Sequence, residues 1–377
     1  SGKTRIGIEI CDWAASNGWV AGFAERDSLA HFRENRGLSE WEWSQPTLIV
    51  VDYAASAARE IRAWLEGLAR KSRRPDRPPF RLLLLERHAD TSTGWWRDVI
   101  APAGVSGLGP DDLVGDGQPA PLHPLESATH HRALLSQAVS AAAALEGKPE
   151  PAIPKPGADS AFDDRLNRTG IETGPLFLIM AGIEGLRNGV PAAMALDRGT
   201  LAQRVAAHER ARLVRLAEAR GWNADDICHL AACATIQGGC DKAAAERLVR
   251  DEWTAMRWPA GRPAQEIAAW LGQALPRSED GIDRVRPDLI GEAFAAAELT
   301  RDGAAVARAW HRDKTGTIDA VVRTAQDYAF GARGHRSLAW ADRLIDEARS
   351  DPADIMLVSA AMPEQTTALR EHAHRSL

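Results

Sequence analysis

The sequence predicts an α/β layer with a parallel sheet in its N-terminal part and a mostly helical remainder. Two continuous apolar runs, Thr47–Val51 and Phe80–Leu85, have the β-branched and leucine-rich character of strands buried in a parallel sheet. Between them, apolar residues from Ile61 to Leu68 recur at helical spacing. Alternation of strand and helix is typical of a doubly wound parallel sheet.

The elements from Thr4 to the second buried strand also alternate between helix and strand. A helix is expected from Thr4 to about Ser16, where Asn17-Gly18 breaks it, and Trp19–Ala24 reads as a short strand. The two buried strands come next, and each ends in charged residues: Asp52 after the first strand, and Glu86-Arg87 after the second.

The rest of the chain has helical character. Residues 147–160 are rich in Pro and Lys and are interpreted as a linker. Three helices followed by a short strand or wing near 283–287 suggest a winged-helix unit over 222–300. The expected domains are a partial α/β core over 1–146, the linker, a helical segment over 161–221, the winged-helix-like unit, and an α-helical region over 301–377 that could start a repeat array.

Composition limits the classes of partner. The net charge of −6 gives no overall reason to expect nucleic acid or an anionic membrane. Four cysteines at irregular spacing form no disulfide framework, which suits a reducing cytoplasm. No apolar run approaches the roughly 20 residues that span a bilayer. We therefore expect a cytoplasmic protein that does not enter the membrane.

The first four residues carry the main chemical signal. Ser1-Gly2-Lys3-Thr4 matches the end of G-x-x-x-x-G-K-[ST], so the chain is expected to begin inside a phosphate-binding loop. In that motif the lysine reaches the β- and γ-phosphates, the threonine ligates Mg²⁺, and backbone amides at the helix N-terminus, here from Ser1 to Arg5, hold the anion. Alone, so short a match is weak, and an ordinary helix start explains it equally well.

A second signal supports the first. Asp52 stands where a Walker B aspartate would hold Mg²⁺ through water, at the carboxyl end of a buried strand. Together the two signals predict a P-loop NTPase core. Arg87, after the next strand, is expected to sense the γ-phosphate, with a surface arginine as the alternative.

The residues after Asp52 bear on the rate of hydrolysis. Many P-loop ATPases place a glutamate there, but Tyr53 and Ala54 follow in this chain, and neither takes a proton from water at neutral pH. Hydrolysis is expected to be slow unless Glu86, Glu60 or a partner supplies the base, which favours a switch over a motor.

Several blocks resemble the bacterial STAND class, the signal-transduction ATPases with numerous domains, especially large actinobacterial members. These blocks are Gly2-Lys3-Thr4-Arg5, Leu48 to Ala54, Arg81 to Arg87 with Trp95-Trp96, Gly174-Pro175-Leu176, His208-Glu209 and Arg286 to Glu292. The resemblance covers most of the chain, although the first three blocks are common to P-loop proteins. Ala55 departs from it, because relatives often carry an acid there.

The resemblance implies an α/β P-loop NTPase core whose first strand is missing, a helical lid, a winged-helix domain and the start of a helical repeat sensor. It further implies ATP/ADP and Mg²⁺ as cofactors, with ADP holding a closed state and ATP an open, self-associating one, and a protein partner on the repeats. Pro175 would touch the adenine or ribose, although proline is a favoured first residue of any helix. The preference for adenine rests on the resemblance alone.

Two other functions stay open. A winged-helix DNA-binding regulator is disfavoured because residues 223–300 hold 13 acidic against 8 basic residues. A scaffold with a degenerate nucleotide site is the other alternative.

Cys228, His229, Cys233 and Cys240 lie near one another in the sequence, but their spacing matches no zinc template. We therefore expect these residues to be buried and structural.

Overall fold

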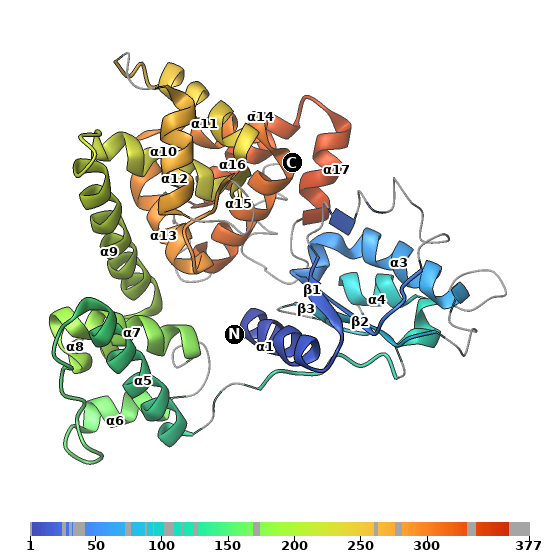
Figure 1. The fold of residues 1–377 in the computed structure, drawn as a ribbon, viewed down its shortest axis with the longest axis horizontal. Coiled ribbons are helices and arrows are strands. Elements are labelled where there is room, and N and C mark those ends of the chain that lie inside the picture. Colours follow the sequence, from blue (N-terminus) through green and yellow to red (C-terminus); the bar gives the residue numbers. More distant parts are fainter. Residues whose placement is uncertain are drawn as a thin grey trace. The chain divides into compact units, whose positions relative to one another are not determined.

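The computed structural model describes residues 2–24, 28–29, 32, 42–71, 77–86, 89–92, 94–101, 109–114, 116–123, 125, 127–168, 174–259, 263–275, 281–329 and 337–361. The chain divides into two compact units, Ser1–Pro124 and Leu125–Leu377. Unit 1 holds a three-stranded sheet and unit 2 is almost entirely helical (Figure 1). The expected parallel sheet followed by a helical remainder is therefore confirmed.

The sheet of unit 1 is parallel throughout. Its strands are β1 (Val20–Phe23), β2 (Thr47–Asp52) and β3 (Phe80–Leu85), in the order β1-β2-β3. In the register of β2 with β3, Asp52 lies opposite Leu85. Because carboxyl ends of parallel strands meet at one edge of a sheet, the residues that follow β2 and β3 meet there too.

Helices cover both faces of this sheet. Leu48 and Val50 point to one face, where they pack with Ala14 of α1 (Lys3–Ser16). Val51, on the opposite face, packs with apolar residues of α3 (Ala58–Lys71) and α4 (Gly94–Ile100). The alternation follows from the two-residue period of a strand. Unit 1 also contains two short 3-10 turns, η1 (Ala54–Ala57) and η2 (Pro110–Leu113).

Gly7 allows α1 to approach the sheet closely. A Cβ atom at this position would lie 2.9 Å from Cζ of Phe23 and 3.0 Å from Cδ1 of Leu85. Glycine therefore sets the helix–sheet distance, and with it the distance from the first turn of α1 to β2.

Unit 2 begins with a group of packed helices. They are α5 (Ala128–Glu146), α6 (Ser160–Asn167), α7 (Pro175–Asn188), α8 (Val190–Met194) and α9 (Arg198–Glu218). Gly182 of α7 approaches Ala138 of α5 so closely that an added Cβ would lie 2.8 Å from the alanine Cβ. The sequence placed α5 at the end of the α/β domain, whereas the compact units place it in unit 2, because its apolar face is buried against α7.

In its described residues, the segment 222–300 that was expected to form a winged helix contains, before its last helix α13 (Asp288–Glu298), three helices and a two-stranded ribbon. The helices are α10 (Ala224–Ile236), α11 (Lys242–Ala255) and α12 (Ala264–Ala274), and the antiparallel strands are β4 (Cys240–Asp241) and β5 (Gly281–Ile282). The second strand lies just before the segment 283–287, where the sequence suggested a wing. The winged-helix assignment itself stays a prediction.

The described C-terminal part is helical, as expected. It contains α13 (Asp288–Glu298), η4 (Leu299–Arg301), α14 (Ala305–Arg312), α15 (Lys314–Ala329), α16 (Ser337–Ala348) and α17 (Pro352–Ala361). Their buried residues belong to the same apolar core as those of α5 to α12. Among the described helices, none has the length and apolar character that a membrane span requires.

Candidate functional site

A hollow lies where α1 begins and where β2 and β3 end. It is lined by residues from these three places: Gly2, Lys3, Thr4, Asp52, Tyr53, Leu85 and Glu86. Four of the sequence-predicted site residues, Gly2, Lys3, Thr4 and Asp52, are thus brought together. They meet because α1 packs on the sheet with its N-terminus at the carboxyl edge of the strands.

The Thr4 hydroxyl and the Asp52 carboxylate are in direct contact. Thr4 Oγ1 donates a hydrogen bond of 2.6 Å to Asp52 Oδ2. Asp52 Oδ1 accepts a hydrogen bond of 3.0 Å from the Tyr53 amide. A hydroxyl and a carboxylate oxygen at this separation are hard oxygen donors suited to Mg²⁺.

The electrostatic potential at the start of α1 favours an anion. Gly2 has φ +106°, a left-handed conformation that favours glycine, and leaves the first turn of the helix open. The first turn contains no acidic residue, and Lys3 adds a positive charge to the positive end of the helix dipole. Anionic phosphate groups are the ligands that such a helix end favours.

Glu86, which lines the hollow, contacts the turn that follows β2. Glu86 Oε2 accepts a hydrogen bond of 2.9 Å from the Ala55 amide. Tyr53, before this turn, has φ +53°, which is unusual for a residue with a side chain and costs about 1–3 kcal/mol. Strained backbone of this kind is often retained at functional sites.

The remaining predicted site residues fall outside this hollow or outside the described chain. Arg5 forms an ion pair with Glu9 one turn further along α1 and does not line the hollow. Pro175 is the first residue of α7, in unit 2. Ser1 and Arg87 lie outside the described residues.

Comparison with known proteins adds no assignment. No protein-family model matches the chain, and no curated protein or solved structure gives a significant match. Function must therefore be argued from the residues and their geometry.

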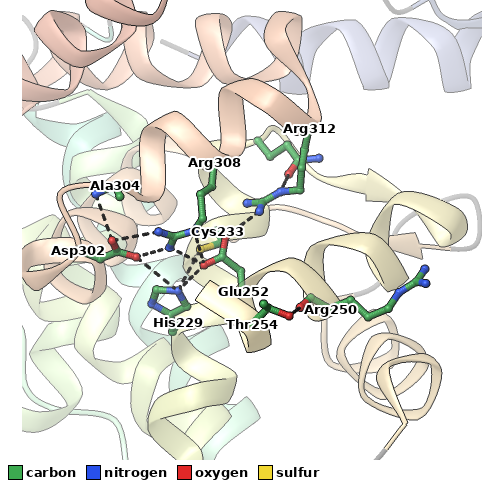
Figure 2. Close-up of polar contacts among 10 residues, drawn as sticks. His229, Cys233, Arg250, Glu252, Thr254, Asp302, Ala304, Arg308 and Arg312 are labelled. Atoms are coloured by element: carbon green, nitrogen blue, oxygen red, sulfur yellow. Dashed lines mark hydrogen bonds and ion pairs between the residues drawn. The ribbon is translucent and has the colours of Figure 1, made fainter. Parts of the chain in front are cut away.

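A second polar cluster is buried in unit 2 (Figure 2). Its centre is Glu252 of α11, which is 0% exposed. Arg308 Nη2 lies 2.6 Å from Glu252 Oε2, and Arg312 Nη1 lies 2.7 Å from Oε1. His229 Nε2 of α10 lies 2.9 Å from Oε2, and Asp302 forms an ion pair with Arg308. The cluster thus ties α10 and α11 to α14.

The same cluster contains a set of metal-ligand atoms. The ligand atoms of His229, Cys233 and Glu252 all lie within 4.8 Å of one another. However, the two carboxylates of the cluster, Glu252 and Asp302, are already balanced by two guanidinium groups, which repel a cation. Burial also raises the pKa of the Cys233 thiol well above its ordinary value, so the thiol stays protonated without a metal. The geometry therefore favours an ion-pair network over a metal centre.

A third buried group titrates near neutrality. Burial, with a contribution from the Asp327 charge, raises the pKa of Glu292 to about 8, although Arg323 opposes the shift. Arg323 Nε donates a hydrogen bond of 2.8 Å to Glu292 Oε1. From the sequence, Glu292 was only the last residue of one block of the STAND resemblance, with no chemical role expected, and the arginines of the second cluster were not singled out. Their only sequence signal is a charged residue at a position that the helical period turns toward the core.

Proposed function

We propose that the chain is an ATP/ADP-binding regulatory NTPase, a conformational switch of the STAND kind with slow hydrolysis, whose nucleotide phosphates and Mg²⁺ bind at the hollow between α1, β2 and β3. The observation that carries this proposal is the Thr4–Asp52 hydrogen bond. In this bond the two predicted Mg²⁺-binding groups, which come from segments far apart in the chain, are in direct contact.

The residues present fit a nucleotide with its metal. Mg²⁺ takes octahedral oxygen ligands and keeps several waters, so one hydroxyl and one carboxylate suffice beside the phosphates. The Thr4 hydroxyl would hold the ion directly, and Asp52 would hold it through water. Lys3 and the amides at the start of α1 would hold the phosphate oxygens.

The proposal that the protein is a switch and not a motor depends on the residue after Asp52. Tyr53 there supplies no base, so any base must come from another element, which supports slower turnover than in ATPases with a glutamate at this position and a long-lived nucleotide state. The choice of adenine, self-association in the ATP state, a protein partner on the C-terminal helices and a cytoplasmic location rest on the STAND resemblance and are proposals on that basis.

Two other functions make different predictions. A DNA-binding winged helix requires salt-dependent binding of duplex DNA, which the acidic excess in residues 223–300 disfavours. A scaffold with a degenerate site requires that no nucleotide binds. Tight nucleotide that copurifies with the intact protein would exclude the scaffold.

Calorimetric titration of ADP and ATP with Mg²⁺ into the full-length protein tests the proposal. Lys3→Ala is expected to abolish binding because the charge at the phosphates is lost. Lys242→Ala is the matched control, since Lys242 is likewise the first residue of a helix, α11, and lies in unit 2. Nucleotide binding that Lys3→Ala leaves unchanged would overturn the assignment of this site.

A further inference from the structure

We propose that Glu86 positions and deprotonates the water that attacks the γ-phosphate of the bound triphosphate. This inference rests on the proposed function and assigns the base that the residues after Asp52 do not supply. Its evidence is the place of Glu86 in unit 1, its contact with the turn after β2, and the location of the competing carboxylates.

Strand register places Glu86 beside the metal-binding groups. Asp52 and Leu85 are partners in the parallel β2–β3 pair, so Glu86 is one residue beyond the partner of Asp52. It lines the same hollow as Lys3 and Thr4. Because β2 and β3 end together, the Glu86 carboxylate lies at the same edge of the sheet as the proposed phosphate-binding residues.

The two carboxylates that line the hollow have different surroundings. Asp52 contacts the Thr4 hydroxyl and its neighbouring Tyr53 amide, which assigns it to the metal. Glu86 instead contacts the Ala55 amide at 2.9 Å. An ionised carboxylate has about four acceptor positions on its two oxygens, and this bond to one oxygen fixes the orientation of the carboxylate at the hollow.

The rival acid is placed differently. Glu60 lies near the start of α3, is 9% exposed and does not line the hollow. Of the two glutamates that the sequence offers as a base, the structure therefore favours Glu86. General-base candidates are judged first by geometry, and this geometry separates them.

The chemical step balances without a further reactant. The water oxygen forms a bond to the γ-phosphorus, and the bond from that phosphorus to the β–γ bridging oxygen breaks. The electron pair of the broken bond stays on the diphosphate. The water proton passes to a Glu86 carboxylate oxygen and then to solvent, so the products are ADP, inorganic phosphate and a proton.

Glu86→Gln and Glu60→Gln form a matched pair of variants for the full-length protein. The glutamine at position 86 keeps an oxygen that accepts from the Ala55 amide but takes up no proton. Three quantities are measured: ATP affinity by calorimetry, phosphate release, and the identity of the bound nucleotide by chromatography after incubation.

Glu86→Gln is expected to bind ATP within about 3-fold of wild type and to release phosphate about 100-fold more slowly, with ATP retained unhydrolysed. Glu60→Gln is expected to behave as wild type, and Glu86→Asp, which keeps a carboxylate, to hydrolyse faster than Glu86→Gln. A wild-type rate in Glu86→Gln, or loss of hydrolysis in Glu60→Gln with normal binding, would overturn the role of Glu86 and leave the nucleotide site standing. Absence of nucleotide binding by the wild-type protein would overturn both proposals.

Discussion

Thr4 Oγ1 lies 2.6 Å from Asp52 Oδ2, so the first turn of α1 is joined to the carboxyl end of β2 by one short hydrogen bond. The two side chains belong to segments that are far apart in the sequence. Thr4 was singled out by the Gly-Lys-Thr motif, and Asp52 by its place at the end of a buried strand. Their contact makes the metal-binding part of the proposed site testable on its own.

Thr4→Val removes the hydroxyl with little change in side-chain volume. We expect the affinity for Mg²⁺-ADP to fall by about 10–100-fold, because a metal ligand is lost. Binding measured with and without Mg²⁺ should then become nearly equal. Thr254→Val is the control, since the Thr254 hydroxyl bonds only to the Arg250 carbonyl among the contacts described for it. A variant that keeps the wild-type Mg²⁺ dependence would argue against Thr4 as a ligand.

Gly7→Val tests the close packing of α1 on the sheet. The added side chain would meet Phe23 and Leu85, whose atoms lie within 3.0 Å of an added Cβ. Overpacking of this kind costs about 1–3 kcal/mol, so the free energy of unfolding of unit 1 should fall by that amount. Gly22→Val is the control, because no atom lies within 4 Å of a Cβ built there. Denaturant unfolding followed by tryptophan fluorescence measures both, and equal stability of the two variants would contradict the packing argument.

Glu252→Gln tests the buried ion-pair network of unit 2. Removal of the shared acceptor leaves Arg308 and Arg312 without their main counter-charge, at a cost of roughly 3–5 kcal/mol. Asp251→Asn, on the same helix and exposed, should change the free energy of unfolding by less than about 0.5 kcal/mol. Urea unfolding of the two variants makes the comparison, and similar stabilities would mean that the network contributes little.

The lowered pKa of the Glu252 carboxyl predicts that the fold loses stability in acid. Burial alone would raise the pKa of Glu252, but hydrogen bonds from His229 and Arg308 and the charge of Arg312 lower it well below its ordinary value of 4.5. A carboxyl whose pKa is lower in the folded state stabilises the fold above 4.5 and loses this contribution as pH falls below that value. Wild-type unfolding free energy should therefore drop steeply with acid, and Glu252→Gln should show a shallower drop.

The raised pKa of Glu292 predicts the opposite effect of pH on stability near neutrality. Its pKa is raised to about 8 by burial, so the folded state binds more protons than the unfolded state between 4.5 and about 8. The contribution of Glu292 is full below 4.5 and is lost as pH rises toward 8. Glu292→Gln should flatten the fall in stability between about pH 5.5 and about pH 8, whereas Glu218→Gln, at an exposed position, should leave it unchanged. Parallel slopes for wild type and Glu292→Gln would contradict the assignment.

The sheet and half of the site could be predicted because their signals are local. Thr47–Val51 and Phe80–Leu85 are apolar runs that any sheet buries, and the rule that parallel strands end at one edge places Asp52 near Glu86. The close approach of α1 was not predicted, because Gly7 looks like any helical glycine until Phe23 and Leu85 lie against it.

The polar network could not be read from the chain in the same way. The helical period shows that Glu252, Arg308 and Arg312 face the core side of their helices, but it does not say which helix packs on which. Pairing of Glu252 with residues of α14 depends on contacts between α10, α11 and α14. The same limit applies to α5, whose apolar face fits either unit until its partner α7 is known.

Amide hydrogen exchange, measured with and without saturating Mg²⁺-ADP, is the sharpest test of the proposed nucleotide site, because it locates the nucleotide as well as detecting it. The proposed site predicts slowed exchange at the first turn of α1, Lys3 to Ile6, and at Tyr53 to Ala55 after β2, and no such protection in Lys3→Ala. Unchanged exchange in these two segments at a nucleotide concentration that saturates the full-length protein would contradict it.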